Sequence, residues 1–168
     1  MKKYLNQYKP FLSFLLKFFL SYIVLTTLYQ YYLNSFDAAS FEIDPITEIV
    51  SVQTQQTIEL FNYNSHLEPH PKQNSNMLFV EDKNVARVVE GCNAISVIIL
   101  FIAFVIAFKG NWKKTVLFIL FGSLLIYVLN VIRIALIAIA LYHYPQQEHL
   151  LHGVVFPLFI YGVVFLLW

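Results

Sequence analysis

Cys92 is the only cysteine in this chain of 168 residues, and it lies where a polar segment meets a long apolar one. A single cysteine forms no disulfide within the chain and builds no cysteine-rich zinc or iron–sulfur site. Two interpretations remain, a small buried apolar side chain or a reactive thiol. The residues that accompany Cys92 favour the second.

Arg133 is the only arginine within a predicted membrane span, and Asn130 lies three residues earlier on the same helical face. An arginine at the centre of a membrane span costs about 2.5 kcal/mol or more and indicates a function by default. The alternative interpretation is that the Arg133 side chain only extends to the outer headgroups. The presence of Asn130 on the same face makes this interpretation weaker. His149 and His152 precede the last apolar run and add two candidate acid–base groups.

These residue types are the parts of a cysteine acyl transfer. A thiolate is the nucleophile, and a nearby cation lowers the pKa of a thiol. A histidine can protonate a leaving amine and then deprotonate the incoming nucleophile. The guanidinium of Arg133 can offer planar donors to a carbonyl oxygen that is becoming an oxyanion, and we expect Asn130 to orient it.

The composition is that of an integral membrane protein. It is 58% hydrophobic and 12% charged, with 16 Phe and 11 Tyr, whereas soluble domains have about 45–50% apolar and about 25% charged residues. The net charge of +1 gives no reason to expect a nucleic-acid partner. The sequence contains no GxGxxG, P-loop or His-Glu-x-x-His motif, and we expect no cofactor and no metal.

Four apolar runs predict an all-α membrane protein with a single domain and about four transmembrane helices. The predicted spans are residues 11–33, 92–108, 115–142 and 150–168. A cleavable signal peptide competes for the first run, but its apolar region would have about 7–15 residues. The first run is longer and ends in a tyrosine belt, which favours a retained span. Lys17 lies about 10 Å from Pro10 on helical rise, close enough for its side chain to reach the basic side.

Residues 34–89 form a polar, mostly acidic loop between the first two spans. Asp44 and Pro45 indicate a helix start, because Asp caps free amides and Pro is tolerated at the first helical position. The apolar spacing that follows predicts an amphipathic helix along the membrane surface or across the mouth of the bundle. Residues 77–80 and 85–89 predict a short hairpin that leads to Cys92. His66 and His70 fit solvated loop histidines better than metal ligands.

The positive-inside rule places the N-terminus and the basic loop 109–114 in the cytoplasm, and the loops 34–89 and 143–152 outside. Cys92 is 17 residues from Lys109, about 26 Å on helical rise, and Arg133 is 19 residues from Lys114, about 28 Å. Against a hydrocarbon core of about 30 Å, both residues reach the outer boundary, where the fourth span begins with the two histidines.

Three sequence blocks, in order, resemble the exosortase/archaeosortase family, and most closely the F-type exosortases (XrtF). They are Glu90-Gly-Cys-Asn-Ala-Ile-Ser, Asn130-Val-Ile-Arg-Ile-Ala, and His152-Gly-Val-Val-Phe-Pro with Ile-Tyr-Gly. The resemblance covers residues 77–168 and is loose over residues 37–61. It implies a multi-pass membrane cysteine transpeptidase in which Cys92 is the nucleophile, Arg133 the oxyanion or thiolate partner, and a histidine the acid–base group. We favour His152, with His149 as the alternative.

The resemblance further implies a bacterial inner-membrane enzyme with its active site on the extracytoplasmic side. Its substrates would be exported proteins with a C-terminal short motif, apolar span and basic tail, and it would pass them to a surface acceptor. The chain departs from the many relatives that have more than four spans. The alternative from another class is a non-catalytic four-helix membrane subunit or scaffold, in which Cys92 would be dispensable. A disulfide or quinone oxidoreductase would need paired cysteines, which the chain lacks.

Overall fold

The computed structural model of the chain describes residues 2–36, 41–108 and 110–147 and the single positions 158, 162 and 165. In the described residues, two α-helices precede three consecutive strands, and two more α-helices follow the strands. In chain order they are α1 (Lys2–Leu33), α2 (Pro45–Leu60), β1 (Ser65–Pro69), β2 (Ser75–Val80), β3 (Lys83–Val89), the 3-10 helix η2 (Glu90–Cys92), α3 (Ile95–Ala107), α4 (Trp112–His143) and the 3-10 helix η3 (Pro145–Gln147).

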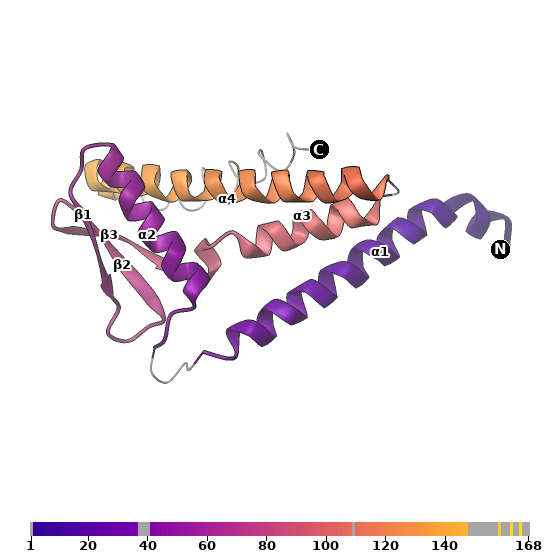
Figure 1. The fold of residues 1–168 in the computed structure, drawn as a ribbon, viewed down its shortest axis with the longest axis horizontal. Coiled ribbons are helices and arrows are strands. Elements are labelled where there is room, and N and C mark those ends of the chain that lie inside the picture. Colours follow the sequence, from indigo (N-terminus) through magenta and orange to yellow (C-terminus); the bar gives the residue numbers. More distant parts are fainter. Residues whose placement is uncertain are drawn as a thin grey trace.

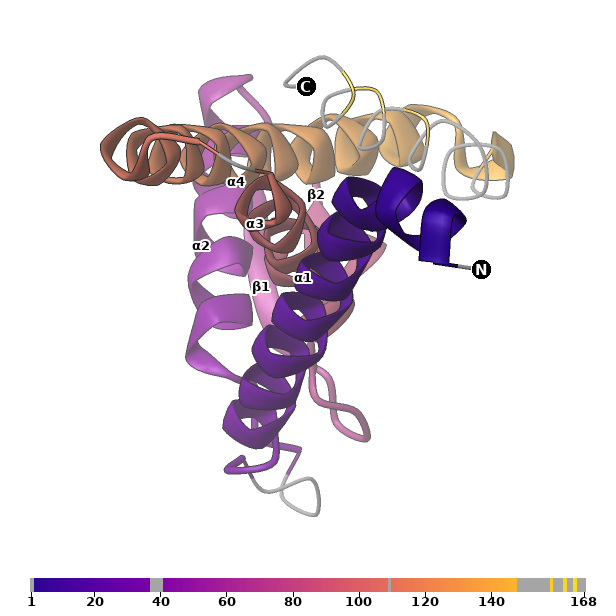
Figure 2. The same ribbon diagram turned by 90° about the vertical axis from the view of Figure 1, so that its right-hand side faces the viewer.

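The long helices extend from one end of the molecule, while α2 and the sheet gather at the other end (Figure 1). Helix α3 lies between α1 and α4, and it packs against both of them. Seen along the bundle, α4 and α1 run in different directions on the two sides of α3 (Figure 2). The start of α1 and the connection from α3 to α4 both lie at the end opposite the sheet.

Two described helices are long and apolar enough to cross a membrane, Tyr8–Leu33 within α1 and Trp112–His143. Helix α3 is apolar but has only 13 residues, about 20 Å on helical rise, which is less than a hydrocarbon core of about 30 Å. The predicted fourth span, 150–168, lies almost entirely outside the described residues. Four transmembrane helices are therefore not seen in the part of the chain that the structure describes.

Helix α3 begins at Ile95, three residues later than the start of the predicted span. Ala94 adopts a left-handed backbone conformation with φ of 64°, and the Asn93 side chain accepts a hydrogen bond from the Ile95 amide at 3.0 Å. The left-handed conformation of Ala94 interrupts the helical path, and the hydrogen bond from the Ile95 amide satisfies one of the free amides at the start of α3. Cys92 consequently lies on the short η2 helix before α3, where the backbone changes direction.

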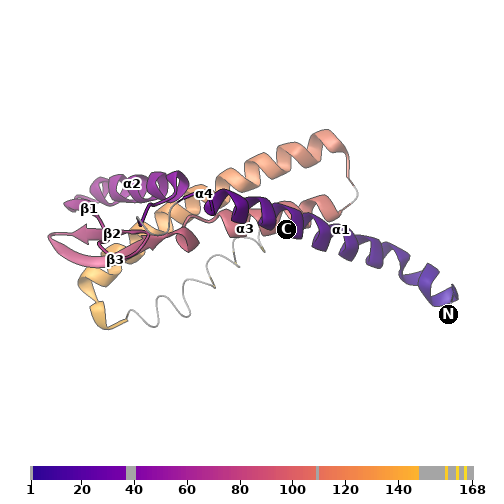
Figure 3. The same cartoon turned by 90° about the horizontal axis from the view of Figure 1, so that it is seen from below.

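Helix α2 begins where the sequence predicts it. The Asp44 carboxylate accepts hydrogen bonds from the Ile46 and Thr47 amides at 3.1 and 3.0 Å, and Pro45 occupies the first turn. This cap satisfies two of the amides that a helix start leaves without partners inside the helix. The helix lies across the far end of α4 and over the sheet (Figure 3).

The sheet corrects the predicted all-α class. It has three antiparallel strands in the order β1-β2-β3, and the predicted hairpin is its second half. The turn at Glu81 and Asp82 has positive φ at both residues, which is the backbone twist that a two-residue hairpin needs. Strand β1 falls where a loop is predicted, because its polar side chains and Pro69 give little strand signal, whereas its pairing with β2 is set by a distant segment.

One apolar core joins α4 to α2 and the sheet. Its fully buried members come from three elements, namely Ile58 of α2, Leu78 and Val80 of β2, and Ala135 and Ala138 of α4. Leu78 and Val80 alternate along β2, so they share one face of the sheet. The second half of α4 is thereby fixed to the sheet end of the molecule, and this contact positions the residues described next.

Candidate active site

Cys92 lies at the junction of four elements. It is a half-buried free thiol at the end of η2, between β3 and α3. Its side chain packs against a cluster of buried residues from α2, β3 and α4, namely Val50, Val88, Val131 and Ile134. The thiol is therefore held in a fixed apolar setting on one side and retains access on the other.

Asn130 fixes the backbone of Cys92 to helix α4. Its side chain is 1% exposed, and Nδ2 donates a hydrogen bond of 2.7 Å to the Cys92 carbonyl oxygen. A buried amide donor that lost this acceptor would cost about 1–3 kcal/mol, so the contact resists a shift of the cysteine along α4. The expected role of Asn130 in orienting Arg133 stays a prediction, and the contact with Cys92 is an additional one.

Arg133 lies one turn beyond Asn130 and belongs to the same neighbourhood. It is half-buried, and its guanidinium interacts electrostatically with Cys92. A cation beside a thiol favours the thiolate, which is the nucleophilic form. The structure therefore brings together three residues that the sequence separates by about 40 positions, Cys92 on one side and Asn130 and Arg133 on the other.

Asn93 is a buried junction residue for which the sequence predicts no role. It is 1% exposed, and Nδ2 donates to the Tyr29 hydroxyl at 2.8 Å and to Thr47 Oγ1 at 3.1 Å. Its Oδ1 also accepts the hydrogen bond from the Ile95 amide, so the Asn93 side chain contacts α1, α2 and the first turn of α3. The signal in the sequence was an asparagine directly before an apolar helix, which is a typical capping position.

Helix α2 covers the site from the sheet end. Thr47 is fully buried against Asn93, and Gln53 Oε1 accepts a hydrogen bond of 2.8 Å from the Tyr127 hydroxyl of α4. Glu48 Oε2 accepts a hydrogen bond of 2.6 Å from Asn76 Nδ2 of β2. These contacts connect α2 to α4 and to the sheet. The predicted helix across the mouth of the bundle therefore closes over the residues around Cys92.

The two histidines predicted as acid–base groups, His149 and His152, lie outside the described residues. Of the described histidines, His143 forms a hydrogen bond of 2.8 Å with the Tyr63 hydroxyl at the end of α4. His66, expected in a solvated loop, is part of β1 and stacks on Phe79. The choice of a histidine for proton transfer stays a prediction.

The described part of the site can provide two of the functions that an acyl transfer needs. It offers a thiol with a fixed backbone and a guanidinium beside it, which can stabilise either a thiolate or a developing oxyanion. A proton donor for the leaving group would have to come from another residue. The arrangement fits a covalent reaction at a carbonyl carbon.

One comparison with known proteins identifies a family for the chain. The family model described as transmembrane exosortase (Exosortase_EpsH) matches residues 9–168, which is nearly the whole chain. No curated protein and no solved structure matches the chain.

Proposed function

Because the chain belongs to the transmembrane exosortase family, we propose that this membrane protein is a cysteine transpeptidase that cleaves C-terminal sorting signals of exported proteins. Its substrates carry a short motif, an apolar span and a basic tail, and the cleaved protein is transferred to a surface acceptor. We further propose that the chain is an exosortase of the F type, because the residues around Cys92 resemble those of that subtype.

One observation carries the proposal. The only cysteine of the chain has its carbonyl held by buried Asn130, and Arg133 lies one turn further along the same helix. An inert core cysteine needs neither contact. An arginine inside a long apolar helix is costly, and its place beside a thiol gives it a chemical use.

In the proposed reaction the Cys92 thiolate attacks the carbonyl carbon of the scissile peptide bond. Arg133 stabilises the oxyanion or the thiolate, and His152, or His149 in its place, protonates the departing amine. The acyl group is then bonded to the Cys92 sulfur. The acceptor nucleophile loses its proton to the same histidine, attacks the acyl carbon and releases the thiolate.

The orientation of the proposed enzyme follows from its charges. The first part of α1, which contains Lys9, and the start of α4, which contains Lys113 and Lys114, lie at the end opposite the sheet (Figure 1), and the segments at the sheet end carry most of the acidic residues. Lysines and arginines concentrate on the cytoplasmic side of short loops. We place the N-terminus in the cytoplasm and the site around Cys92 at the outer face of the bacterial inner membrane.

The test replaces Cys92 with serine and with alanine in cells that contain a substrate. Both variants should accumulate in the membrane and leave the substrate uncleaved, with its C-terminal span intact on a gel. A membrane-impermeant maleimide should label the native protein from outside and not the Cys92→Ala variant. Thr27→Ala, which changes an exposed side chain of α1, is the control and should cleave normally. Normal processing by Cys92→Ala would refute the proposal and favour the non-catalytic subunit.

A further inference from the structure

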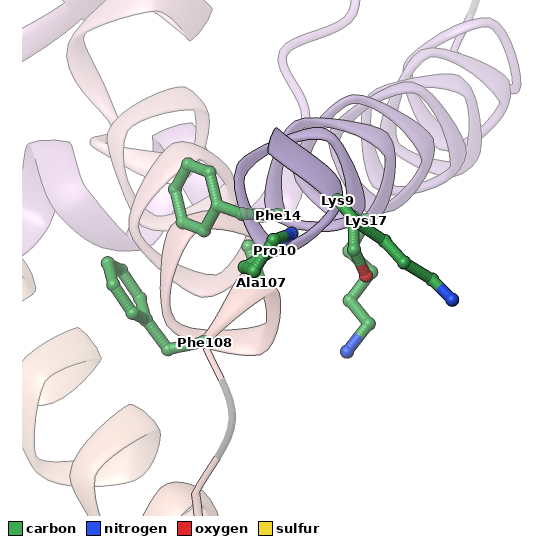
Figure 4. A pocket seen from close by; sticks show the side chains of 7 residues that line it. Lys9, Pro10, Phe14, Lys17, Ala107 and Phe108 are labelled. Carbon is green, nitrogen blue, oxygen red and sulfur yellow. The ribbon is translucent and has the colours of Figure 1, made fainter. Parts of the chain in front are cut away.

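A groove lies between α1 and α3 at the end opposite the sheet, away from Cys92. It has a volume of about 500 Å³. Its lining combines two lysines with apolar walls and consists of Lys9, Pro10, Ser13, Phe14, Lys17, Ala107 and Phe108. Figure 4 shows the Lys9 and Lys17 side chains leaving α1 on the same side, with Phe14 and Phe108 on the other side of Pro10 and Ala107.

The polar residues of the groove form a regular stripe along α1. Lys9, Ser13, Lys17 and Ser21 are spaced four apart in the sequence, so they lie along one side of the helix. The Ser21 hydroxyl lies 3.4 Å from the Ala103 carbonyl oxygen, within hydrogen-bond distance, which puts the stripe beside α3. The two lysines are about 12 Å apart along the axis, and Ser13 lies between them.

Lys17 is a charged side chain on an apolar helix, and the described residues give it no negative partner. It lies within the candidate span Tyr8–Leu33, where a charged side chain is costly. Among the residues that the structure describes, neither Lys9 nor Lys17 forms an ion pair. A side chain that only extends to water would need no neighbouring groove, whereas this groove offers a hydroxyl and aromatic walls beside both ammonium groups.

We propose that this groove is a binding site for an anionic phospholipid. Lys9 and Lys17 bind the phosphate as cations, the Ser13 hydroxyl donates a hydrogen bond to it, and one acyl chain lies against Phe14, Ala107 and Phe108. A basic pocket between membrane helices at the cytoplasmic side suits an anionic headgroup. A choline headgroup would bring a further positive charge next to the two lysines. A free phosphate ion has no apolar part that could lie against the apolar wall.

The bound lipid would attach α1 to the rest of the bundle. The apolar window of α1 has no residues buried inside the molecule, and α1 packs mainly along α3. A lipid that contacts both helices adds contacts at the end where α1 extends past α3 (Figure 1). The predicted result of binding is a higher melting temperature and not a change in the chemistry at Cys92.

The test measures the melting temperature of the purified, delipidated protein in neutral detergent during titration with phosphatidylglycerol, phosphatidylcholine or inorganic phosphate. Phosphatidylglycerol alone should raise it saturably. Each lysine near an anionic headgroup contributes about a fivefold factor in affinity, so Lys17→Gln should weaken binding about fivefold and Lys9→Gln/Lys17→Gln about 25-fold. Lys113→Gln, an exposed lysine at the same end of the molecule, is the matched control and should change the affinity less than about twofold.

Lys17→Leu separates the lipid site from general stability. It removes a charge from an apolar helix, so its melting temperature without lipid should equal or exceed that of the native protein, while its affinity for phosphatidylglycerol falls about fivefold, as in Lys17→Gln. An equal response to phosphatidylcholine, an equal response to inorganic phosphate, or equal losses in Lys17→Gln and Lys113→Gln would each overturn the proposal.

Discussion

Asn93→Ala should destabilise the protein by about 3 kcal/mol. The Asn93 side chain forms hydrogen bonds with the Tyr29 hydroxyl, Thr47 Oγ1 and the Ile95 amide. A hydrogen bond contributes about 1 kcal/mol net, and a buried group that loses its partner costs about as much or more. Since the three partners belong to α1, α2 and α3, the variant should loosen the contact of all three helices at the site.

The assay is reversible unfolding of the purified protein in mixed micelles, followed by circular dichroism. Tyr29→Phe removes one of the three hydrogen bonds and should cost about 1 kcal/mol. Its matched control is Tyr31→Phe, because Tyr31 is on the same helix and is 80% exposed. The Tyr31 variant should lie within about 0.5 kcal/mol of the native protein.

A double-mutant cycle makes the prediction refutable. In the Asn93→Ala background the Tyr29→Phe change should cost almost nothing, which gives a coupling energy of about 1 kcal/mol. Additive effects of the two substitutions would show that the hydrogen bond contributes nothing. The reasoning would also be refuted if Tyr29→Phe and Tyr31→Phe had the same free energy of unfolding.

Three further predictions concern the packing and the proposed chemistry. Gly122→Ala should destabilise the protein by about 1–3 kcal/mol, because an added Cβ would collide with the buried Phe101 ring of α3. Gly91→Ala is the control, because a Cβ there has open space, and this variant should unfold like the native protein in the same assay. Arg133→Lys should lose most substrate cleavage, since an ammonium lacks the planar donors, and Asn130→Ala should lose less; full cleavage by the lysine variant would reduce the role of Arg133 to its charge. His152→Ala should abolish cleavage while His149→Ala weakens it or shifts its pH dependence, and the opposite result would transfer the acid–base role to His149.

The sequence determined the features that depend on near neighbours. The Asp44 cap joins atoms two and three residues apart, so the start of α2 could be predicted from two residues. Helix rise depends only on residue number, so the sequence alone predicts similar depths for Cys92 and Arg133, although the structure begins α3 only at Ile95. The hairpin of β2 and β3 was predicted for the same reason, because its two strands are separated by a two-residue turn.

The tertiary structure decided what depends on distant partners. Asn93 meets Tyr29 and Thr47 across 64 and 46 positions, and Asn130 meets the Cys92 carbonyl across 38. A local sequence pattern does not predict which polar residues will become buried hydrogen-bond partners. Each of them could face water equally well until the helices pack. For that reason neither the contact of Asn130 with the Cys92 carbonyl nor a role for Asn93 could be predicted from the sequence. Strand β1 could not be predicted for the same reason. Its own residues have little preference for a strand, and its extended conformation is stabilised by hydrogen bonds with β2.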